Sequence, residues 1–314
     1  MIVENTIKFR RLIPIIWKRM AKMTILSSMI VIPIVVFDLQ QLTISLEAPL
    51  ILGTAISIFL GFRTNSAHDR WFQGRALWGD IGANTRNLAL LCGRVDESYK
   101  NRNTGKVSTK AKPIMRRMIN RAIALMWVLG RQLKDLPPTE YEDLKDFLEA
   151  DELEALKDTH NPSLKLLFNQ SKDFRSAYDE GQFVDGEHFE FVAIQRELAA
   201  TMTRCFSLKN TRFPTHYTYF TDLFVWLLVV LLSFSLPANE ANGLYAIPIA
   251  VLIGWIFSMI EGIGDYMDYP WANNRNVVPT DFLTRDHEID IRAYALGQTE
   301  NLPQVIKPVE GALY

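Results

Sequence analysis

The chain has 314 residues, and its 34 Lys and Arg against 35 Asp and Glu leave a formal net charge of -1. This balance provides no global attraction to nucleic acid or to another strongly charged partner. The basic residues are unevenly spread, because residues 23–62 and 213–274 contain no Lys or Arg. A soluble domain distributes Lys and Arg over its surface, so the two basic-free stretches indicate segments that lie in a membrane.

Four apolar segments within these stretches are typical of membrane helices. Most are shorter than the roughly 20 residues needed to cross about 30 Å of hydrocarbon. Flanking aromatic residues, such as Tyr217 and Tyr245, can extend the helices into the membrane interface. The predicted spans cover residues 24–36, 48–62, 223–236 and 244–260.

The distribution of basic residues also predicts the orientation of the spans. The connections 37–47 and 237–243 contain acidic residues but no Lys or Arg. Cytoplasmic loops carry the excess of positive charge, so we expect the middle of the chain and both ends to be cytoplasmic. The protein is then a multi-pass protein of the cell inner membrane or plasma membrane. The predicted domains are 1–62 (an N-terminal amphipathic segment and two spans), 63–212 (a cytosolic helical domain), 213–268 (two spans) and 269–314 (a cytosolic C-terminal segment).

The region between the two pairs of spans has the pattern of α-helices. Apolar residues recur at helical spacing over residues 66–91, 113–133 and 187–208, and alternation typical of strands is absent from the sequence. Asn161-Pro162 predicts the start of a further helix. An acidic stretch near residues 149–154 has the composition of a solvated helix face. The predicted fold class is therefore an all-α membrane protein with four transmembrane helices and a helical cytosolic domain.

Sequence signatures of enzymes are absent. The chain contains no HExxH, no glycine-rich phosphate loop, no GxSxG and no paired Cys/His cluster. Cys92 and Cys205 fit no CxxC pattern and are expected to be free thiols. We therefore predict that the protein is not an enzyme and that it has no metal site and no cofactor.

The second span carries a ridge of small residues. Gly53, Ser57 and Gly61 follow one another at intervals of four, which places them on one side of a helix. Small residues allow membrane helices to approach closely. Ordinary packing inside one bundle explains the ridge as well as packing between copies of the chain does.

A second ridge lies beside the first. Thr54, Ile58 and Phe62 have the same spacing and point about 100° away from the small residues. In a symmetric ring of such helices these side chains would line the axis. A ring of apolar side chains forms a dry constriction, which can gate ions by dewetting.

The residues of this span and those that follow it resemble the bestrophin family, most closely its bacterial branch. The resemblance rests on GTAISIFLGFRTNSAHDRWFQGR at residues 53–75 and LWG at residues 77–79. A second similarity is the pattern Cys205, Asn210-Thr211, Pro214 and Tyr217 before the third span. A looser one, in the C-terminal region, comprises Glu261, Pro270 and residues 288–291. Together the similarities extend over nearly the whole chain.

The resemblance implies a homopentameric ion channel with a central pore, surrounded by membrane lipid and conducting small monovalent ions. The neck of the pore would be formed by the second membrane helix, at Thr54, Ile58 and Phe62. A second constriction at the cytosolic mouth would lie within residues 186–191, where Phe189 and Phe191 are the candidates. These expectations follow from the family and not from the spacing alone.

Gating and selectivity are also expectations from the resemblance. Animal members bind Ca²⁺ at a run of consecutive acids after the fourth span, whereas this chain has only Asp265 and Asp268, which are not adjacent. Ca²⁺ needs six to eight oxygen ligands, so we predict a channel that is not gated by Ca²⁺. Animal members conduct anions and bacterial members have been linked to cations; here we favour cations slightly over chloride. The candidate charges at the pore mouths are Glu47, Arg63, Glu187 and Glu190.

Two alternatives stay open from the sequence. A small-solute transporter would usually have more spans, broken helices and an internal repeat. A membrane-anchored scaffold or enzyme domain would account for the large middle region, but it would not explain two adjacent ridges on the second span.

Overall fold

A computed structural model describes residues 9–98, 111–211, 214–238, 243–272, 277–298 and 300–308, and all regular secondary structure in these ranges is helical. The described residues form two compact units. We call the unit of residues 9–71 and 214–269 the membrane unit, and the unit of residues 72–211 and 270–308 the polar unit. The predicted all-α fold is confirmed.

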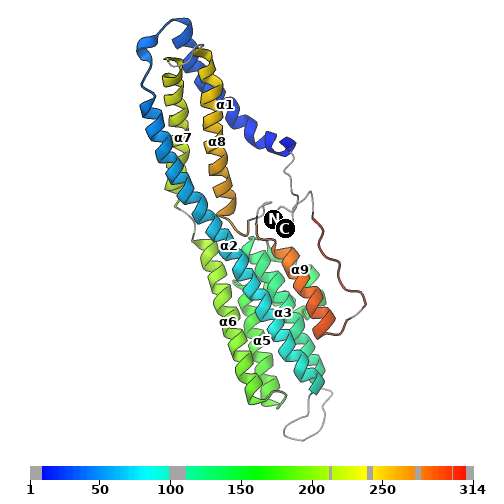
Figure 1. The fold of residues 1–314 in the computed structure, drawn as a ribbon. Coiled ribbons are helices and arrows are strands. Elements are labelled where there is room, and N and C mark those ends of the chain that lie inside the picture. The colour runs from blue at the N-terminus through cyan, green and yellow to red at the C-terminus, as the bar shows by residue number, and fades with distance from the viewer. Residues whose placement is uncertain are drawn as a thin grey trace. The chain divides into compact units, whose positions relative to one another are not determined.

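The membrane unit contains four helices that can cross a bilayer, as predicted. They are α1 (Phe9–Val36), the first part of α2 (Glu47–Ser98), α7 (Thr215–Ser235) and α8 (Ala246–Met267), which lie side by side in Figure 1. All four are long and apolar enough for a membrane span. Short 3₁₀ turns adjoin these helices at Gln40–Leu42, Leu236–Ala238 and Gly243–Tyr245.

The core of the membrane unit forms where α1, α7 and α8 meet the inner side of α2. Met23, Ile56, Leu60 and Val229 are all buried in this cluster. Gly254 on α8 allows the closest approach, because a Cβ at this position would collide with Val229. A larger residue would therefore separate α7 from α8.

Helix α2 differs from the sequence expectation. The sequence predicted a span that ends near residue 62 and a separate helix over residues 66–91, whereas the structure has one helix of 52 residues. No proline occurs between residues 50 and 112, so nothing interrupts the backbone hydrogen bonds. Within the membrane unit, the positions along α2 therefore have a defined angular relation to one another.

The polar unit is a bundle around α3 (Ala111–Leu133). The other elements are the second part of α2, η2 (Pro138–Asp146), α4 (Ala150–Lys157), α5 (Pro162–Asp179), α6 (Asp185–Asn210), α9 (Thr280–Asp290) and a π-turn, η5 (Ile291–Ala295). Residues 121–130 of α3 are all buried, which is the pattern of a helix enclosed on every side. Helix α5 begins as predicted, because the Asn161 side chain accepts a hydrogen bond from the Leu164 amide at 3.2 Å.

Candidate functional site

The two sides of α2 within the membrane unit have opposite environments. Ile56 and Leu60 are each 1% exposed and belong to the core. Ile58 is 56% exposed and Phe62 is 70% exposed. Successive residues on an α-helix are about 100° apart, so Ile58 points about 160° away from both Ile56 and Leu60. The ridge of Thr54, Ile58 and Phe62, which we call the outer face, is thus turned away from the core.

Thr54 is the polar member of the outer face. It is exposed, and its hydroxyl donates a hydrogen bond to the Leu50 carbonyl one turn earlier at 2.9 Å. The hydroxyl proton is therefore used within the helix, while the oxygen keeps its acceptor capacity. The rest of the outer face, Ile58 and Phe62, is apolar.

The small-residue ridge is only partly used within the subunit. A Cβ on Gly53 would lie 3.8 Å from Leu228, whereas a Cβ on Gly61 would meet nothing within 4 Å. Ser57 is exposed, and its hydroxyl donates to the Gly53 carbonyl at 2.8 Å. Packing within one bundle therefore accounts for Gly53 but not for Ser57 and Gly61.

Arg63 lies on the inner side of α2, where it is 4% exposed. One guanidinium nitrogen is 3.5 Å from Glu261 Oε1, and another forms an ion pair with Asp265. Glu261 also pairs with Arg19 of α1 at 3.1 Å, and Arg19 pairs with Asp222 of α7. A buried charge requires such partners. The expectation that Arg63 is a charge at a pore mouth is therefore wrong, because this side chain links α2 to α8 inside the subunit.

Glu47 and the candidates on α6 have different surroundings. Glu47 is exposed at the first turn of α2. Glu187 caps its own helix, because its Oε2 accepts a hydrogen bond from the Val184 amide at 2.9 Å. Glu190 is exposed at the following turn. Of the two α6 acids, Glu187 has a structural role that the sequence reasoning missed.

Phe189 and Phe191 point to opposite environments. Phe189 is 72% exposed, whereas Phe191 is 2% exposed and stacks on Phe174 of α5, with 3.5 Å between the ring centroids. A ring in the core has no surface with which to line a passage. The prediction for Phe191 is therefore wrong, and Phe189 is the candidate that keeps an accessible side chain.

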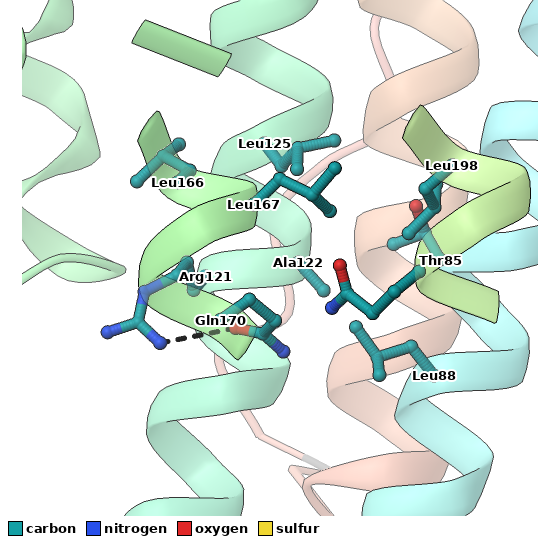
Figure 2. Close-up of a pocket in the computed structure, with 10 residues that line it drawn as sticks. Thr85, Leu88, Arg121, Ala122, Leu125, Leu166, Leu167, Gln170 and Leu198 are labelled. Atoms are coloured by element: carbon teal, nitrogen blue, oxygen red, sulfur yellow. Dashed lines mark hydrogen bonds between the residues drawn. The ribbon is translucent and has the colours of Figure 1, made fainter. Parts of the chain in front are cut away.

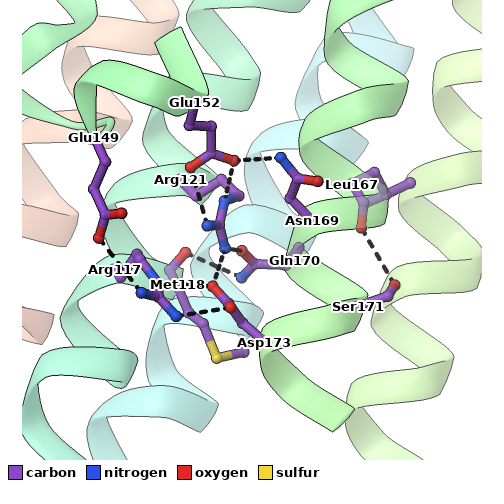
Figure 3. A network of polar contacts seen from close by, with 10 residues as sticks. All are labelled: Arg117, Met118, Arg121, Glu149, Glu152, Leu167, Asn169, Gln170, Ser171 and Asp173. Atoms are coloured by element: carbon purple, nitrogen blue, oxygen red, sulfur yellow. Dashed lines mark hydrogen bonds and ion pairs between the residues drawn. The ribbon is translucent and has the colours of Figure 1, made fainter. Parts of the chain in front are cut away.

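A network of ion pairs in the polar unit was not anticipated from the sequence (Figure 3). Arg121 is 4% exposed and donates to both oxygens of Glu152, at 2.7 and 3.0 Å, and to Asp173 at 2.6 Å. Arg117 holds the same Asp173 from the preceding turn at 2.7 Å. Glu152 belongs to the acidic stretch that was interpreted as a solvated face, and that interpretation is wrong for this residue. The sequence does contain one signal of this network, because Arg121 interrupts the apolar pattern of α3.

A small pocket lies beside this network, between α2, α3, α5 and α6 (Figure 2). Gln170 and Gln195 face it from two of these helices, and neither amide atom of Gln195 has a hydrogen-bond partner among the described residues. The cavity volume is only about 10 Å³, which suits a single water molecule and not an organic ligand.

His287 packs directly on α2 within the polar unit. A Cβ on Gly82 would collide with its imidazole, so only glycine allows this contact. Burial, assisted by the nearby Arg86 guanidinium, lowers the pKa of His287 to about 4. The imidazole is therefore neutral at physiological pH. Among the described residues, no three His, Cys, Asp or Glu side chains are grouped so that they could hold a metal ion.

Comparison with known proteins identifies the family. The model of the bacterial and fungal bestrophin proteins matches residues 6–293. The chain belongs to the bestrophin family. A bacterial bestrophin homologue from Klebsiella pneumoniae has the same fold, with a TM-score of 0.79 and 22% identity over 90% of this chain and 99% of that one.

Two relatives are similar to this bestrophin over most of their length. The voltage-dependent anion channel-forming protein YneE of Salmonella typhi is 24% identical, covering 88% of this chain and 85% of the relative. A voltage-dependent anion channel-forming protein of Nostoc sp. is 28% identical, covering 84% of this chain and 87% of the relative.

Proposed function

We propose that this bestrophin forms a homopentameric ion channel in which α2 of each subunit lines a shared central path. The observation that carries the proposal is the outer face of α2, where Ile58 and Phe62 are exposed on the side opposite the core. Membership of the bestrophin family and the naming of its relatives as channel-forming proteins support it.

The exposure of the membrane unit supports a shared path. In the apolar, membrane-spanning stretch of α2, only 17% of the residues are buried inside the subunit. The corresponding share for α7 is 39%. The helix therefore needs lipid or other subunits to cover it. Ser57 and Gly61 offer a neighbouring helix a close approach, and this contact turns the outer face toward the symmetry axis.

The neck then has two parts. Ile58 and Phe62 form the dry constriction, where loss of water blocks ions until the ring widens. Thr54 places a hydroxyl oxygen at the outer end and keeps that end hydrated. Phe189 is the proposed second constriction, because its ring is accessible at the start of α6.

The distribution of basic residues supports a cytoplasmic polar unit and cytoplasmic termini in the inner or plasma membrane. The apolar surfaces of the spans that do not face another subunit contact lipid. We propose that Ca²⁺ does not gate the channel, because Asp265 is paired with Arg63 and Asp268 is paired with Arg70. Carboxylates held by guanidinium groups are poor candidates for Ca²⁺ ligands.

Recording from purified protein in planar bilayers tests the proposal. In asymmetric NaCl the wild type should show currents, and their reversal potential gives the selectivity among small monovalent ions. The slight preference for cations stays a prediction, since the relatives are named for anions. Ile58→Ala and Phe62→Ala should each raise the conductance, because both remove apolar bulk from the neck.

Three results would contradict the proposal. Silent bilayers for the wild type and both variants would favour a membrane-anchored scaffold or enzyme domain. Saturable flux of a small solute without channel currents would favour a transporter. A detergent-corrected mass that is not five times the subunit mass of 36.0 kDa would contradict the pentamer.

A further inference from the structure

We propose that Asp69 determines the selectivity of this channel, because five copies form a ring of carboxylates below the neck that favours cations over anions. This inference rests on the proposed function and assigns a role to a residue outside the neck. It is carried by the placement of Asp69 on α2 and by the pairing of the nearby arginines.

The geometry of α2 puts Asp69 on the same side of the helix as the outer face. Asp69 follows Phe62 by seven residues in an unbroken helix, so the two side chains point within about 20° of each other. At 1.5 Å per residue, Asp69 lies about 10 Å further along the helix axis. Its side chain is 60% exposed. If Phe62 lines the path, Asp69 lines it two turns later.

The basic residues of this part of α2 do not neutralise the ring. Arg63 and Arg70 are the only Arg or Lys within residues 47–71. Both point away from the outer face and bind carboxylates of the α8 region, Arg63 at Asp265 and Glu261 and Arg70 at Asp268, the last at 2.7 Å. Within residues 47–71, the side of α2 that continues the outer face therefore carries carboxylates at Glu47 and Asp69 but no guanidinium group.

His68 is the titratable neighbour of Asp69 on the helix. Its Nδ1 is 3.9 Å from Asp69 Oδ1, and its side chain is 59% exposed. A change at His68 thus tests whether the imidazole modulates the ring.

A ring of like charges around a narrow path acts on every passing ion. Cations are concentrated and anions are excluded, which is how acidic rings function in cation channels. The effect is screened by salt, because the Debye length falls from about 10 Å at 0.1 M to about 3 Å at 1 M. Selectivity that arises from Asp69 must therefore weaken at high ionic strength.

The test is the reversal potential of the full-length channel in asymmetric KCl, with Asp69→Asn compared with the wild type. The permeability ratio of K⁺ to Cl⁻ should fall at least about threefold, since charges a few ångströms away change an ion's energy by about the thermal energy or more. The fall should be smaller at 1 M than at 0.1 M salt. Asn65→Asp, which adds a carboxylate one turn earlier on the same side, should raise the ratio.

Asp38→Asn is the matched control. Asp38 is exposed in the connection after α1 and has a positive φ of 52°, which asparagine tolerates. The Asp38→Asn variant removes one negative charge per subunit outside α2, and it should leave the permeability ratio of K⁺ to Cl⁻ unchanged. Asp69→Glu keeps the charge and should also retain selectivity, which separates charge from folding. His68→Gln should change the ratio less than Asp69→Asn does.

The outcomes separate this inference from the proposed function. A conducting Asp69→Asn channel with the wild-type ratio would overturn the role of Asp69 and leave the channel proposal intact. An equal change in Asp38→Asn would also overturn it, because the effect would then be non-specific. A silent wild type would overturn the channel proposal, and the inference with it.

Discussion

The two sides of α2 in the membrane unit are similar in composition but differ in what covers them. The inner side presents Ile56, Leu60 and Arg63 to other helices of the same subunit. The outer face presents Ile58 and Phe62, and no side chain of the described subunit covers them to a comparable extent. Hydrophobicity alone does not distinguish the two sides. Changes on the inner side should therefore affect folding, and changes on the outer face should affect conduction.

The largest expected effect is on the inner side, at Arg63. Arg63→Ala leaves Glu261 buried at 3% exposure with Arg19 as its remaining partner. Breaking a buried ion pair costs about 3–5 kcal/mol, so the folded subunit should lose that much stability. Denaturant titration of the detergent-solubilised protein would measure the loss.

The matched control for Arg63 is the double variant Arg63→Met with Glu261→Gln. Removing both charges should restore part of the stability, since no buried carboxylate is left without a partner, and Asp265, the other partner of Arg63, is 51% exposed to solvent. If Arg63→Ala were as stable as the wild type, the inner network would not hold α2 to α8.

Leu60 and Ile58 provide a direct comparison of the two sides. Leu60→Ala creates a cavity in the core and should cost about 2–5 kcal/mol of unfolding free energy. Ile58→Ala removes an exposed side chain and should cost the subunit less than about 1 kcal/mol. Parallel denaturant titrations would check this difference. Equal losses would mean that the two sides are not distinct.

A substitution at Gly61 distinguishes an effect on assembly from an effect on folding. A Cβ at this position meets nothing within 4 Å in the subunit, so Gly61→Leu should leave the subunit fold unchanged. At a subunit interface the same change should cost about 1–3 kcal/mol per contact and reduce the pentamer fraction measured by mass in detergent. Gly262→Leu is the control, because Gly262 is equally open but lies on α8. A pentamer unaffected by Gly61→Leu would exclude this ridge from the interface.

A smaller effect than at Arg63 is expected in the continuation of α2 in the polar unit, where His287 packs on Gly82. The folded-state pKa of about 4 lies below the ordinary value of 6.5, so the unfolded chain takes up the proton first. The stability contributed by the neutral imidazole is complete above pH 6.5 and is lost as the pH falls toward 4. The loss at pH 5 should be about 1–2 kcal/mol in urea titrations. His287→Gln should flatten this pH dependence, and an unchanged slope would contradict it.

The sequence predicted the parts of the molecule that depend on a regular period. The four spans followed from basic-free apolar stretches, and the outer face followed from the spacing of Thr54, Ile58 and Phe62. The continuity of α2 was missed because the charges after residue 62 suggested a boundary. Helix geometry continues through such a change of composition when no proline interrupts it.

Other features depend on tertiary contacts that no local pattern encodes. Phe189 and Phe191 are equivalent in the sequence GEHFEF, and only the position of Phe174 on α5 decides which ring is buried. The partners of Arg63, Glu261 and Asp265, lie about 200 residues away in the sequence. Only the fold brings these two carboxylates beside the guanidinium group. Long-range ion pairs of this kind need the folded structure.

Cysteine accessibility along α2 tests directly whether the outer face lines the conduction path. The native Cys92 and Cys205 are both fully buried, and burial raises the pKa of Cys205 to about 12, so this thiol stays protonated and unreactive. Single cysteines would be placed on the outer face (Thr54→Cys, Ile58→Cys, Phe62→Cys) and on the inner side (Ile56→Cys, Leu60→Cys). A charged thiol reagent would then be applied during bilayer recording. Modification should change the current for the three cysteines on the outer face and leave it unchanged for the two on the inner side. Sensitivity at residues 56 and 60, with none at residues 54, 58 and 62, would contradict it.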